Sequence, residues 1–429
     1  MPPKGPSGPF FHGRGRPTTH PGKIAAPTRH PIALTTPLPS PAVSPAQLRR
    51  GLIAIFASTF CELSGLFMFF PLLLFTAKGL GLNDALVGLL AATNWLGLAV
   101  ATPFAGGWVA RLGMRGALLL SGAVPLGTLT LTVLTPWPVG WALLGVVGGA
   151  AGSLRWIVAE ATVAELAPAA RRGRIVGLYE TMVGCTFVLG PSLLAFIGTE
   201  GAAAQLARWT AVALSALGLL LSFAVPALTS HHREDAPPPG WRGIAAAMRQ
   251  RPVLMLAGAV GGFFEAGTSG LLPLYGLSAG FGAGMAALLV SASGAGSALV
   301  MVPVGELADR WSLRGVLLGC AAITLGACLL LPLAPAWPPL AYVIAFVWGG
   351  AGGALYTLAM VDIGHREQGV ALVNTTAVLV LSYTLGGMAA PMLGGLALSL
   401  APGWGMPLLM IAVAGTGLAA LLKAPAASI

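Results

Sequence analysis

The chain alternates between long apolar runs and short polar or Pro/Gly-rich breaks from residue 52 to residue 423. A helix needs about 20 consecutive apolar residues to cross the hydrocarbon core of a bilayer, and the runs are of that length. Divided at its breaks, the pattern predicts an all-α membrane protein with twelve transmembrane helices. The predicted helices span residues 52–75, 86–106, 116–135, 139–164, 175–198, 207–228, 253–275, 284–304, 315–334, 339–361, 370–398 and 403–423.

Two segments interrupt this pattern. Residues 1–48 are rich in Pro, carry basic residues and have no acidic residue, so they cannot bury a core and we expect a disordered tail. Such a tail either stays solvated or lies against anionic headgroups, and an over-extended gene start would look the same. The break 229–252 is the longest hydrophilic segment after the tail. The predicted domains are a cytoplasmic tail (1–48), an N-terminal six-helix bundle (49–228), a cytoplasmic linker (229–252) and a C-terminal six-helix bundle (253–425).

Composition supports the membrane assignment. Of the 429 residues, 56% are hydrophobic and only 8% are charged, and the mean hydropathy is +0.84. The chain therefore has too few polar residues to cover the surface of a soluble domain. The four Cys residues lie inside apolar runs without paired spacing, so neither a disulfide framework nor a zinc site is indicated. We expect no cofactor, no metal ion and no nucleic acid as a partner, and a monomer in the lipid bilayer.

Lys and Arg residues fall mostly on one side of the predicted topology, and the positive-inside rule places that side in the cytoplasm. The first apolar run is too long for the core of a signal peptide, and no small-residue cleavage site follows it, so we expect it to be retained. The sequence thus predicts a multi-pass protein of the cell inner membrane with both termini in the cytoplasm. The cytoplasmic side carries Arg50, Arg111, Arg115, Arg171, Arg172, Arg174, Arg233, Arg242, Arg249, Arg251, Arg310, Arg314, Arg366 and Lys423, and the other side carries Lys78 and Arg208.

One short charged stretch occurs twice. Residues 103–116 read PFAGGWVARLGMRG, and residues 303–315 read PVGELADRWSLRG. Further residues recur at separations between 199 and 203 residues over six helices, so we infer an internal duplication. The matched pairs are Gly106 with Gly305, Arg111 with Arg310, Arg115 with Arg314, Pro71 with Pro273, Glu62 with Glu265, and Pro191 with Pro391.

The repeated stretch resembles the signature loop of the major facilitator superfamily, whose usual form is G-x-x-x-D-R-x-G-R-R. The second copy keeps Asp309 and Arg310, whereas the first has Ala110 where the Asp belongs. Residues 165–180 look like the loop between the fourth and fifth helices of many members, and residues 354–387 are similar to bacterial members called YcaD-like. By this resemblance, the chain is identified as a twelve-helix transporter of the superfamily.

The resemblance implies two pseudo-symmetric six-helix bundles around a central cavity, which the halves open to alternate sides by rocking. It also implies that Asp309 and Arg310 hold neighbouring helices together at the cytoplasmic face when the cavity opens outward. Ala110 leaves the first half without the acidic member, and simple positive-inside anchoring is the alternative explanation of the Arg residues. The residues of this expected cytoplasmic gate are Gly106, Arg111, Arg115, Gly305, Asp309 and Arg310.

The fifth and eleventh predicted helices carry Gly-Pro patterns, GCTFVLGP at 184–191 and LGGMAAPMLGG at 385–395. They resemble the fifth-helix pattern of the family, which is linked with antiporters, and both copies are imperfect. Small residues let helices approach closely, and Pro loosens the backbone ladder. We therefore expect Gly190, Pro191 and Pro391 to form a helix-packing motif, which small-residue packing alone would also explain.

Charged residues inside the predicted spans indicate a functional site, because an ionised side chain near the bilayer centre costs about 2.5–3.5 kcal/mol. Measured along the helix, Glu62 lies ~18 Å, Glu265 ~21 Å and Arg155 ~24 Å from the cytoplasmic end. A buried Glu can take up a proton, whereas Arg keeps its charge. We expect Glu62 or Glu265 to carry a proton, with Arg155 as the fixed charge that competes with it. Alternatively, Arg155 only pins helices together through a Glu.

Polar and aromatic residues add to these charges, and together they suit an amphipathic organic molecule better than an inorganic ion. Glu180 and Asp362 lie near the cytoplasmic ends, where we expect water to reach them, and with Glu160 they are the next acids to examine. The candidate residues of the substrate and proton pathway are Glu62, Arg155, Glu265, Asn94, Tyr356 and Asn374.

Together these features predict a proton-coupled secondary transporter that exports a small amphipathic compound by alternating access. Proton-driven uptake of an organic acid or sugar is the alternative, which Arg155 as a carboxylate anchor favours. A transport-fold sensor without flux is the alternative from another class. An enzyme is not expected, because the sequence has no DDxxD cluster, no His pair at the spacing of a metal site, no GxSxG and no P-loop. The expected partners are the substrate, protons and the lipid bilayer.

Overall fold

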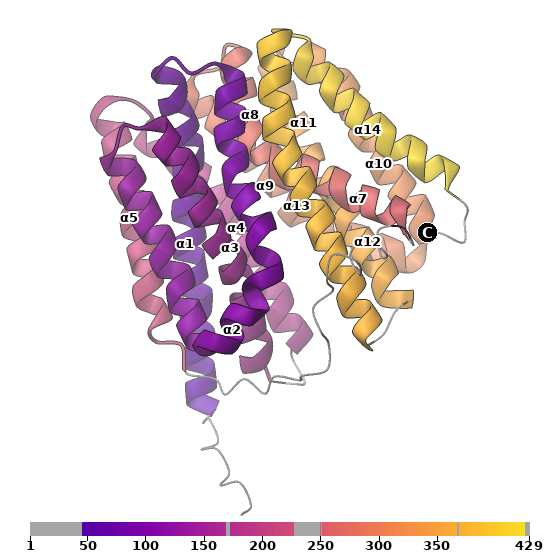
Figure 1. The fold of residues 1–429 in the computed structure, drawn as a ribbon. Coiled ribbons are helices and arrows are strands. Elements are labelled where there is room, and N and C mark those ends of the chain that lie inside the picture. Colours follow the sequence, from indigo (N-terminus) through magenta and orange to yellow (C-terminus); the bar gives the residue numbers. More distant parts are fainter. Residues whose placement is uncertain (1–44, 169–171, 227–248, 250, 367–368, 425–429) are drawn as a thin grey trace, which may run out of the picture. The chain divides into compact units, whose positions relative to one another are not determined.

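The computed structural model describes residues 45–168, 172–226, 249, 251–366 and 369–424 (Figure 1). Within these ranges, twelve helical spans are long and apolar enough to cross a membrane, which confirms the predicted all-α membrane fold. The elements, with η for π- and 3-10 helices, are α1 (Pro45–Gly79), α2 (Asp84–Leu134), α3 (Pro138–Leu166), α4 (Arg172–Ile197), α5 (Gly201–Ser222), α7 (Pro252–Gly262), η2 (Phe263–Gly267), α8 (Thr268–Ser278), α9 (Ala283–Arg310), α10 (Leu313–Leu330), η3 (Leu331–Leu333), α11 (Pro338–Val347), η4 (Trp348–Gly352), α12 (Gly353–Arg366), α13 (Gly369–Leu400) and α14 (Gly405–Lys423).

Three elements depart from a simple helix-per-span pattern. The second and third spans are joined within α2 at Gly113, whose φ of 70° is readily reached only without a Cβ. The seventh span consists of α7, η2 and α8, and the tenth consists of α11, η4 and α12, so that each contains a π-helix in its middle. We predicted uninterrupted helices at 253–275 and 339–361, and apolar periodicity gives no sign of such an inserted residue.

The two halves repeat each other in their turns. After the first span, Gly81 adopts a φ of 84°, and after the seventh span Gly280 adopts the same value. In both turns the next residue donates its backbone N–H to a carbonyl five residues earlier, Leu82 to Ala77 and Phe281 to Gly276. This is the glycine-terminated helix end in which a left-handed residue closes the last turn. Its occurrence at matching places supports the duplication inferred from the sequence.

Helix crossings repeat as well. A Cβ on Gly97 would lie 2.0 Å from the carbonyl oxygen of Val146, where the second span crosses the fourth. A Cβ on Gly296 would lie 1.9 Å from the carbonyl oxygen of Phe346, where the eighth span crosses the tenth. Only glycine permits backbones this close, so each half uses the same small residue at the same crossing.

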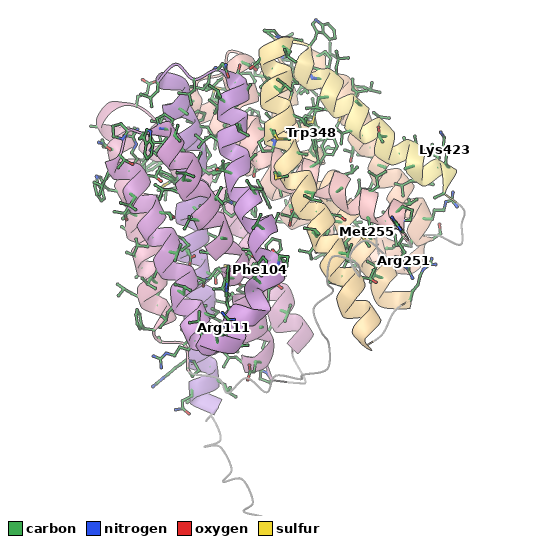
Figure 2. All side chains as sticks on the ribbon, viewed as in Figure 1. Phe104, Arg111, Arg251, Met255, Trp348 and Lys423 are labelled. Atoms are coloured by element: carbon green, nitrogen blue, oxygen red, sulfur yellow. The ribbon has the colours of Figure 1, made fainter. Side chains whose placement is uncertain are left out.

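The helices have a basic end, which carries Arg310 and also Arg111 and Arg251, both labelled in Figure 2. The opposite end carries the turns at Gly81 and Gly280. This alternation is the one that the sequence predicts. α1 begins at Pro45, so residues 45–48 are helical rather than part of the expected tail. The rest of the predicted tail and most of the predicted linker lie outside the described residues.

The halves contact each other along two seams, α2 with α13 and α4 with α9 (Figure 1). On the first seam, a Cβ on Gly88 would lie 2.2 Å from the carbonyl oxygen of Pro391. On the second, the hydroxyl oxygens of Ser192 and Ser291 are 3.0 Å apart. These four residues lie in the parts of their helices that are remote from the basic end, so these contacts hold the halves together near the opposite end.

Candidate functional site

Glu265 lies in η2, in the middle of the seventh span, and is half-buried. Ser297 on α9 donates a hydrogen bond from its hydroxyl to Oε1 of Glu265 at 2.5 Å. Tyr383 on α13 donates its hydroxyl to Oε2 at 3.1 Å. Among the ion pairs of the described residues, none includes Glu265. Two neutral hydroxyl groups, and not a cation, therefore hold this carboxylate.

Two π-helices meet at this site. The ring of Phe264 in η2 lies 5.7 Å from the ring of Trp348 in η4, measured between centroids. Gly353 follows η4 directly, and a Cβ there would lie 2.8 Å from the carboxyl carbon of Glu265. π-Helices are frequent at functional sites because the inserted residue redirects the helix. Here the two distorted spans bring the backbone of the tenth against the carboxylate of the seventh.

Tyr356, a predicted pathway residue, lies beside Glu265. Its ring centroid is 4.6 Å from that of Tyr383. The Tyr356 hydroxyl is within electrostatic reach of Glu265 and also of Glu160 and Glu180 of the first half. Glu180 is exposed and Glu160 is half-buried. Tyr356 thus lies in the electrostatic field of carboxylates from both halves.

Glu62 and Arg155 form an ion pair inside the first half, with 3.2 Å between Oε2 and Nη2. Their side chains are only 7% and 4% exposed. Arg155 also donates to the hydroxyls of Ser222 on α5, at 3.1 Å, and of Ser58 on α1. The pair therefore connects α1, α3 and α5 within one bundle.

This placement bears on the role that we predicted for Arg155, a fixed charge that competes with the proton on Glu62 or Glu265. Such competition requires that the distance between Arg155 and the acid changes during transport. Glu62 and Arg155 belong to one bundle, so rigid-body rocking leaves their distance unchanged. At 4% exposure, Arg155 also offers almost no surface to a substrate carboxylate. The geometry is that of the alternative, in which Arg155 pins helices together through a Glu.

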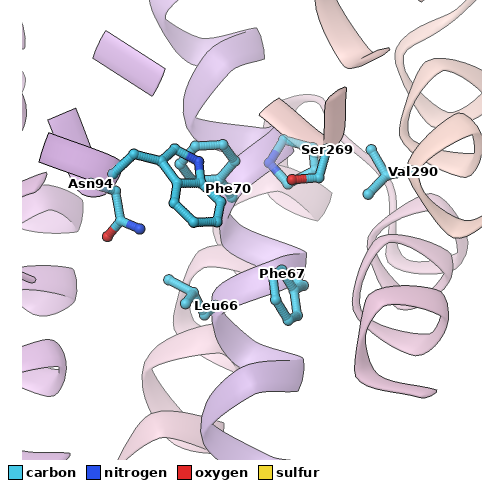
Figure 3. A pocket seen from close by; sticks show the side chains of 8 residues that line it. Leu66, Phe67, Phe70, Asn94, Ser269 and Val290 are labelled. Atoms are coloured by element: carbon cyan, nitrogen blue, oxygen red, sulfur yellow. The ribbon is translucent and has the colours of Figure 1, made fainter. Parts of the chain in front are cut away.

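Asn94 on α2 lines a pocket of about 40 Å³ between the halves (Figure 3). Phe70 of α1, Ser269 of α8 and Val290 of α9 are also in its wall. Pockets for drug-sized ligands measure about 300–1,000 Å³, so this pocket has room only for water. The remaining pathway candidate, Asn374, has a side chain outside the described part of the chain.

The predicted gate residues lie at the basic end. Arg310 is 77% exposed, and its ion-pair partner is Glu306, one turn earlier on the same helix, at 3.9 Å. Arg111 is exposed as well, and a Cβ on Gly305 would meet nothing within 4 Å. The side chain of Asp309 is outside the described part, as is the environment of Gly106. The proposed clamp therefore stays a prediction.

The second arginine of each repeated stretch, Arg115 in the first and Arg314 in the second, contacts the end of another helix. Arg115 donates to the carbonyl oxygen of Phe223 at 3.2 Å, where α5 ends. Arg314 donates to the carbonyl oxygens of Leu421 and Leu422, both at 3.4 Å, where α14 ends. A cation at a helix C-terminus satisfies free carbonyls and interacts favourably with the helix dipole. Each of these arginines thus caps the last helix of its own half.

Asp362 corrects a second expectation, because its side chain is 3% exposed rather than wetted. Its carboxylate lies 3.2 Å from Nη1 of Arg251 and 2.8 Å from Nε of Arg366. The spacing of four residues between Asp362 and Arg366 on one helix was a sequence signal for this pair. The cluster ties the start of the seventh span to the end of the tenth.

The predicted packing motif lies at helix contacts. A Cβ on Gly190 would lie 2.8 Å from the backbone nitrogen of Met68, so α4 approaches α1 closely there. Pro191 is buried in α4, and the carbonyl of Pro391 contacts α2. The described residues include no group of three or more His, Cys, Asp or Glu side chains that could hold a metal ion.

The described residues form twelve spans in two repeated halves, with a carboxylate held between spans of one half, and this arrangement defines a polytopic membrane protein. The sequence profile of the Major Facilitator Superfamily matches residues 55–380, and the chain belongs to this family. The protein is therefore a secondary transporter of a solute, and it is not an enzyme.

Curated relatives are similar over most of the chain. An uncharacterised MFS-type transporter of Yersinia pestis (strain Pestoides F) is 28% identical over 318 residues, 71% of this chain and 78% of its own length. The uncharacterised MFS-type transporter YfkF of Bacillus subtilis (strain 168) is 24% identical over 338 residues, 76% and 83% of the two chains.

Solved structures share the fold at low identity. The nucleoside transporter NupG superimposes with a TM-score of 0.68 at 13% identity, covering 88% of this chain and 100% of its own. A bacterial homologue of the human lysosomal transporter Spinster, in an inward-facing and unoccupied conformation, gives a TM-score of 0.65 at 17% identity, covering 88% and 95%. At these identities the likeness concerns the fold alone.

Proposed function

We propose that the protein exports an amphipathic compound in exchange for protons and that Glu265 carries the proton. The observation that carries this proposal is the set of partners of Glu265, the hydroxyls of Ser297 and Tyr383 at 2.5 and 3.1 Å. An acid in a membrane span is expensive to keep ionised without a cation. Glu265 can avoid this cost by taking up a proton or by contacting a cationic substrate. Exchange of one for the other is antiport.

Glu62 is a poorer proton carrier than Glu265. Its carboxylate is paired with Arg155 and is nearly inaccessible, at 7% exposure. Taking up a proton there would leave the charge of Arg155 buried without a partner, which is strongly unfavourable. Among the described residues, Glu265 has no ion-pair partner that its protonation would leave uncompensated. It is half-buried beside Tyr356. The two acids matched by the sequence repeat therefore have different roles in this proposal.

The charges near Tyr356 favour a neutral or cationic substrate. Glu160 accepts a hydrogen bond from the indole nitrogen of Trp156, and Glu180 is exposed. Carboxylates together with an aromatic ring suit a cation that also carries apolar surface. Uptake of an organic acid needed Arg155 as its anchor, and Arg155 is engaged with Glu62. The export alternative is the better supported of the two.

We place the basic end in the cytoplasm of the cell, with the protein in the inner membrane, by the positive-inside rule. The bundles 49–228 and 253–425 then rock as two bodies. The contacts between Gly88 and Pro391, and between Ser192 and Ser291, lie away from the basic end. The halves thus contact each other at the end that we place outside the cytoplasm. This arrangement fits a state open to the cytoplasm, from which an exporter takes up its substrate and into which an importer releases it.

The test is transport into proteoliposomes of a panel of fluorescent amphipathic cations and matched neutral and anionic compounds, with and without an imposed pH gradient. Glu265→Gln should abolish accumulation driven by the gradient and preserve exchange at equal pH. Glu62→Gln should retain gradient-driven transport per folded molecule. Glu200→Gln, at an exposed acid outside the predicted gate and pathway, is the matched control.

Full gradient-driven transport by Glu265→Gln would overturn the assignment of the proton site. Accumulation of anions alone, driven by inward proton flow, would favour uptake of an organic acid. Binding of a compound without flux in wild-type liposomes would favour the sensor.

A further inference from the structure

Four spans contribute to the surroundings of the Glu265 carboxylate. The seventh carries Glu265 itself, the eighth carries Ser297, the tenth carries Gly353 and the eleventh carries Tyr383. Ser297 and Tyr383 each donate to a different carboxylate oxygen. We use the term carboxylate seat for Ser297, Gly353 and Tyr383.

Gly353 has a special relation to the carboxylate. A Cβ at this position would lie 2.8 Å from the carboxyl carbon of Glu265, 3.0 Å from its Oε2 and 2.8 Å from Cε of Met301. All three atoms belong to ends of flexible side chains. At Gly349, in contrast, a Cβ would lie 1.8 Å from the backbone carbonyl oxygen of Ser293. Gly349 permits a helix crossing, whereas the space at Gly353 is filled by the carboxylate.

We propose that Gly353, Ser297 and Tyr383 are positioning residues that set the proton affinity of Glu265. This proposal rests on the proposed function, in which Glu265 carries the proton. The two hydroxyls stabilise the ionised carboxylate, and the missing side chain at Gly353 lets the carboxylate reach both. The π-helices η2 and η4 serve this arrangement, because Glu265 lies within one and Gly353 directly follows the other.

A methyl group at position 353 should therefore weaken both hydrogen bonds to Glu265 without changing Ser297 or Tyr383. It would displace the carboxylate from the seat, and both hydrogen bonds would lengthen together. Since the contacted atoms are side-chain ends, Gly353→Ala should fold. Tyr383→Phe and Ser297→Ala remove one donor each and leave the backbone space unchanged. Three variants at three spans should thus give one kind of effect.

The experiment is an infrared pH titration of the purified full-length protein in lipid, which follows the C=O stretch of protonated carboxyl groups. Glu265→Gln identifies the band, because the variant loses it. Tyr383→Phe and Ser297→Ala should change the frequency of that band and move its titration midpoint to higher pH by about one unit for each lost hydrogen bond to the carboxylate. Gly353→Ala should move both quantities in the same directions.

Gly319→Ala is the matched control, because a Cβ there meets nothing within 4 Å, and its band should equal that of the wild type. If Glu265→Gln removes a band but Tyr383→Phe, Ser297→Ala and Gly353→Ala leave its frequency and midpoint unchanged, the positioning proposal is wrong and the proposed function stands. If Glu265→Gln removes no titrating band, Glu265 does not carry the proton, and the proposed function is wrong together with the positioning proposal that rests on it. Should Gly353→Ala not fold, the two hydroxyl variants decide by the same two readouts.

Discussion

Arg155 and Glu62 form an ion pair of 3.2 Å within a single bundle, and neither side chain is more than 7% exposed. Removing one partner of a buried pair leaves the other charge uncompensated, at a cost of about 3–5 kcal/mol. Glu62→Gln should therefore lower the apparent midpoint of thermal unfolding in detergent, followed by tryptophan fluorescence. The double variant Glu62→Leu, Arg155→Met should recover much of the loss.

The double variant is informative because the hydroxyls that now contact Arg155 have other partners. Ser58 and Ser222 lie 2.6 Å apart, and Ser58 donates to the carbonyl of Gly218 at 2.8 Å. They remain satisfied without the arginine. A double variant as unstable as the single one would show that the pairing of charges is not the reason for the instability.

The caps at the last helix of each half give a second prediction. Arg115→Ala and Arg314→Ala should each destabilise the end of α5 or α14 by about 0.3–1 kcal/mol, because the free carbonyls lose a cation. Hydrogen exchange followed by mass spectrometry should accelerate in peptides covering 215–226 and 414–424, respectively. Replacement by Lys should retain part of the protection.

Arg111→Ala is the control for these caps, since its exposed side chain belongs to the same loop. Equal acceleration at α5 in Arg111→Ala and Arg115→Ala would mean that loop charge, and not the bond to Phe223, protects the helix end.

The helix crossings at Gly97 and Gly296 give a third prediction. A Cβ would lie 2.0 and 1.9 Å from backbone carbonyl oxygens, and backbones cannot move aside as side-chain ends can. Alanine at either position should therefore cost about 1–3 kcal/mol or more and reduce the yield of monodisperse protein in size-exclusion chromatography. Gly319→Ala should behave as wild type. Normal yield and unfolding midpoint in both variants would contradict the close crossing.

A fourth prediction concerns the seam between α4 and α9. The hydroxyl oxygens of Ser192 and Ser291 are 3.0 Å apart, so cysteines at these positions can approach bonding distance. In a background without the native cysteines, the pair Ser192→Cys, Ser291→Cys should form a disulfide under mild oxidation and stop transport, with recovery on reduction. The native cysteines to be replaced are Cys61, Cys185, Cys320 and Cys328.

Each single cysteine variant serves as the control, and both should transport in oxidising conditions. Transport that continues at the full rate in the cross-linked protein would show that this seam does not open during the cycle.

The fold could be predicted from the sequence because each span must be long enough to cross the membrane. Span length did not predict how the second and third spans are joined, which occurs at Gly113. Its φ of 70° lets one helix follow the other with no separate loop between them. The predicted and observed helix boundaries therefore differ most at this position. The π-helices η2 and η4 could not be predicted, since an inserted residue leaves the apolar pattern intact. Their cause lies in packing between spans.

The candidate site was predicted in part. Glu62 and Glu265 were predicted as acids within the first and seventh spans, where the structure places them, and their role in proton transfer stays a prediction. Tyr356 was predicted as a pathway residue, and it lies beside Glu265. The repeat made the two acids look equivalent, whereas their partners differ, an arginine for Glu62 and two hydroxyls for Glu265. Which side chains meet across helices depends on helix rotation, and residue spacing along one chain does not determine it.

The ion pair of the first half also sets an order of events during synthesis. Glu62 is made 93 residues before Arg155, and Ser222 follows 67 residues after Arg155. At about 5–20 residues per second, the first span waits about 5–20 s for the cation that neutralises its acid. The first three helices therefore enter the bilayer before Glu62 has its ion-pair partner on the fourth, and the cluster is complete only when Ser222 at the end of α5 has followed.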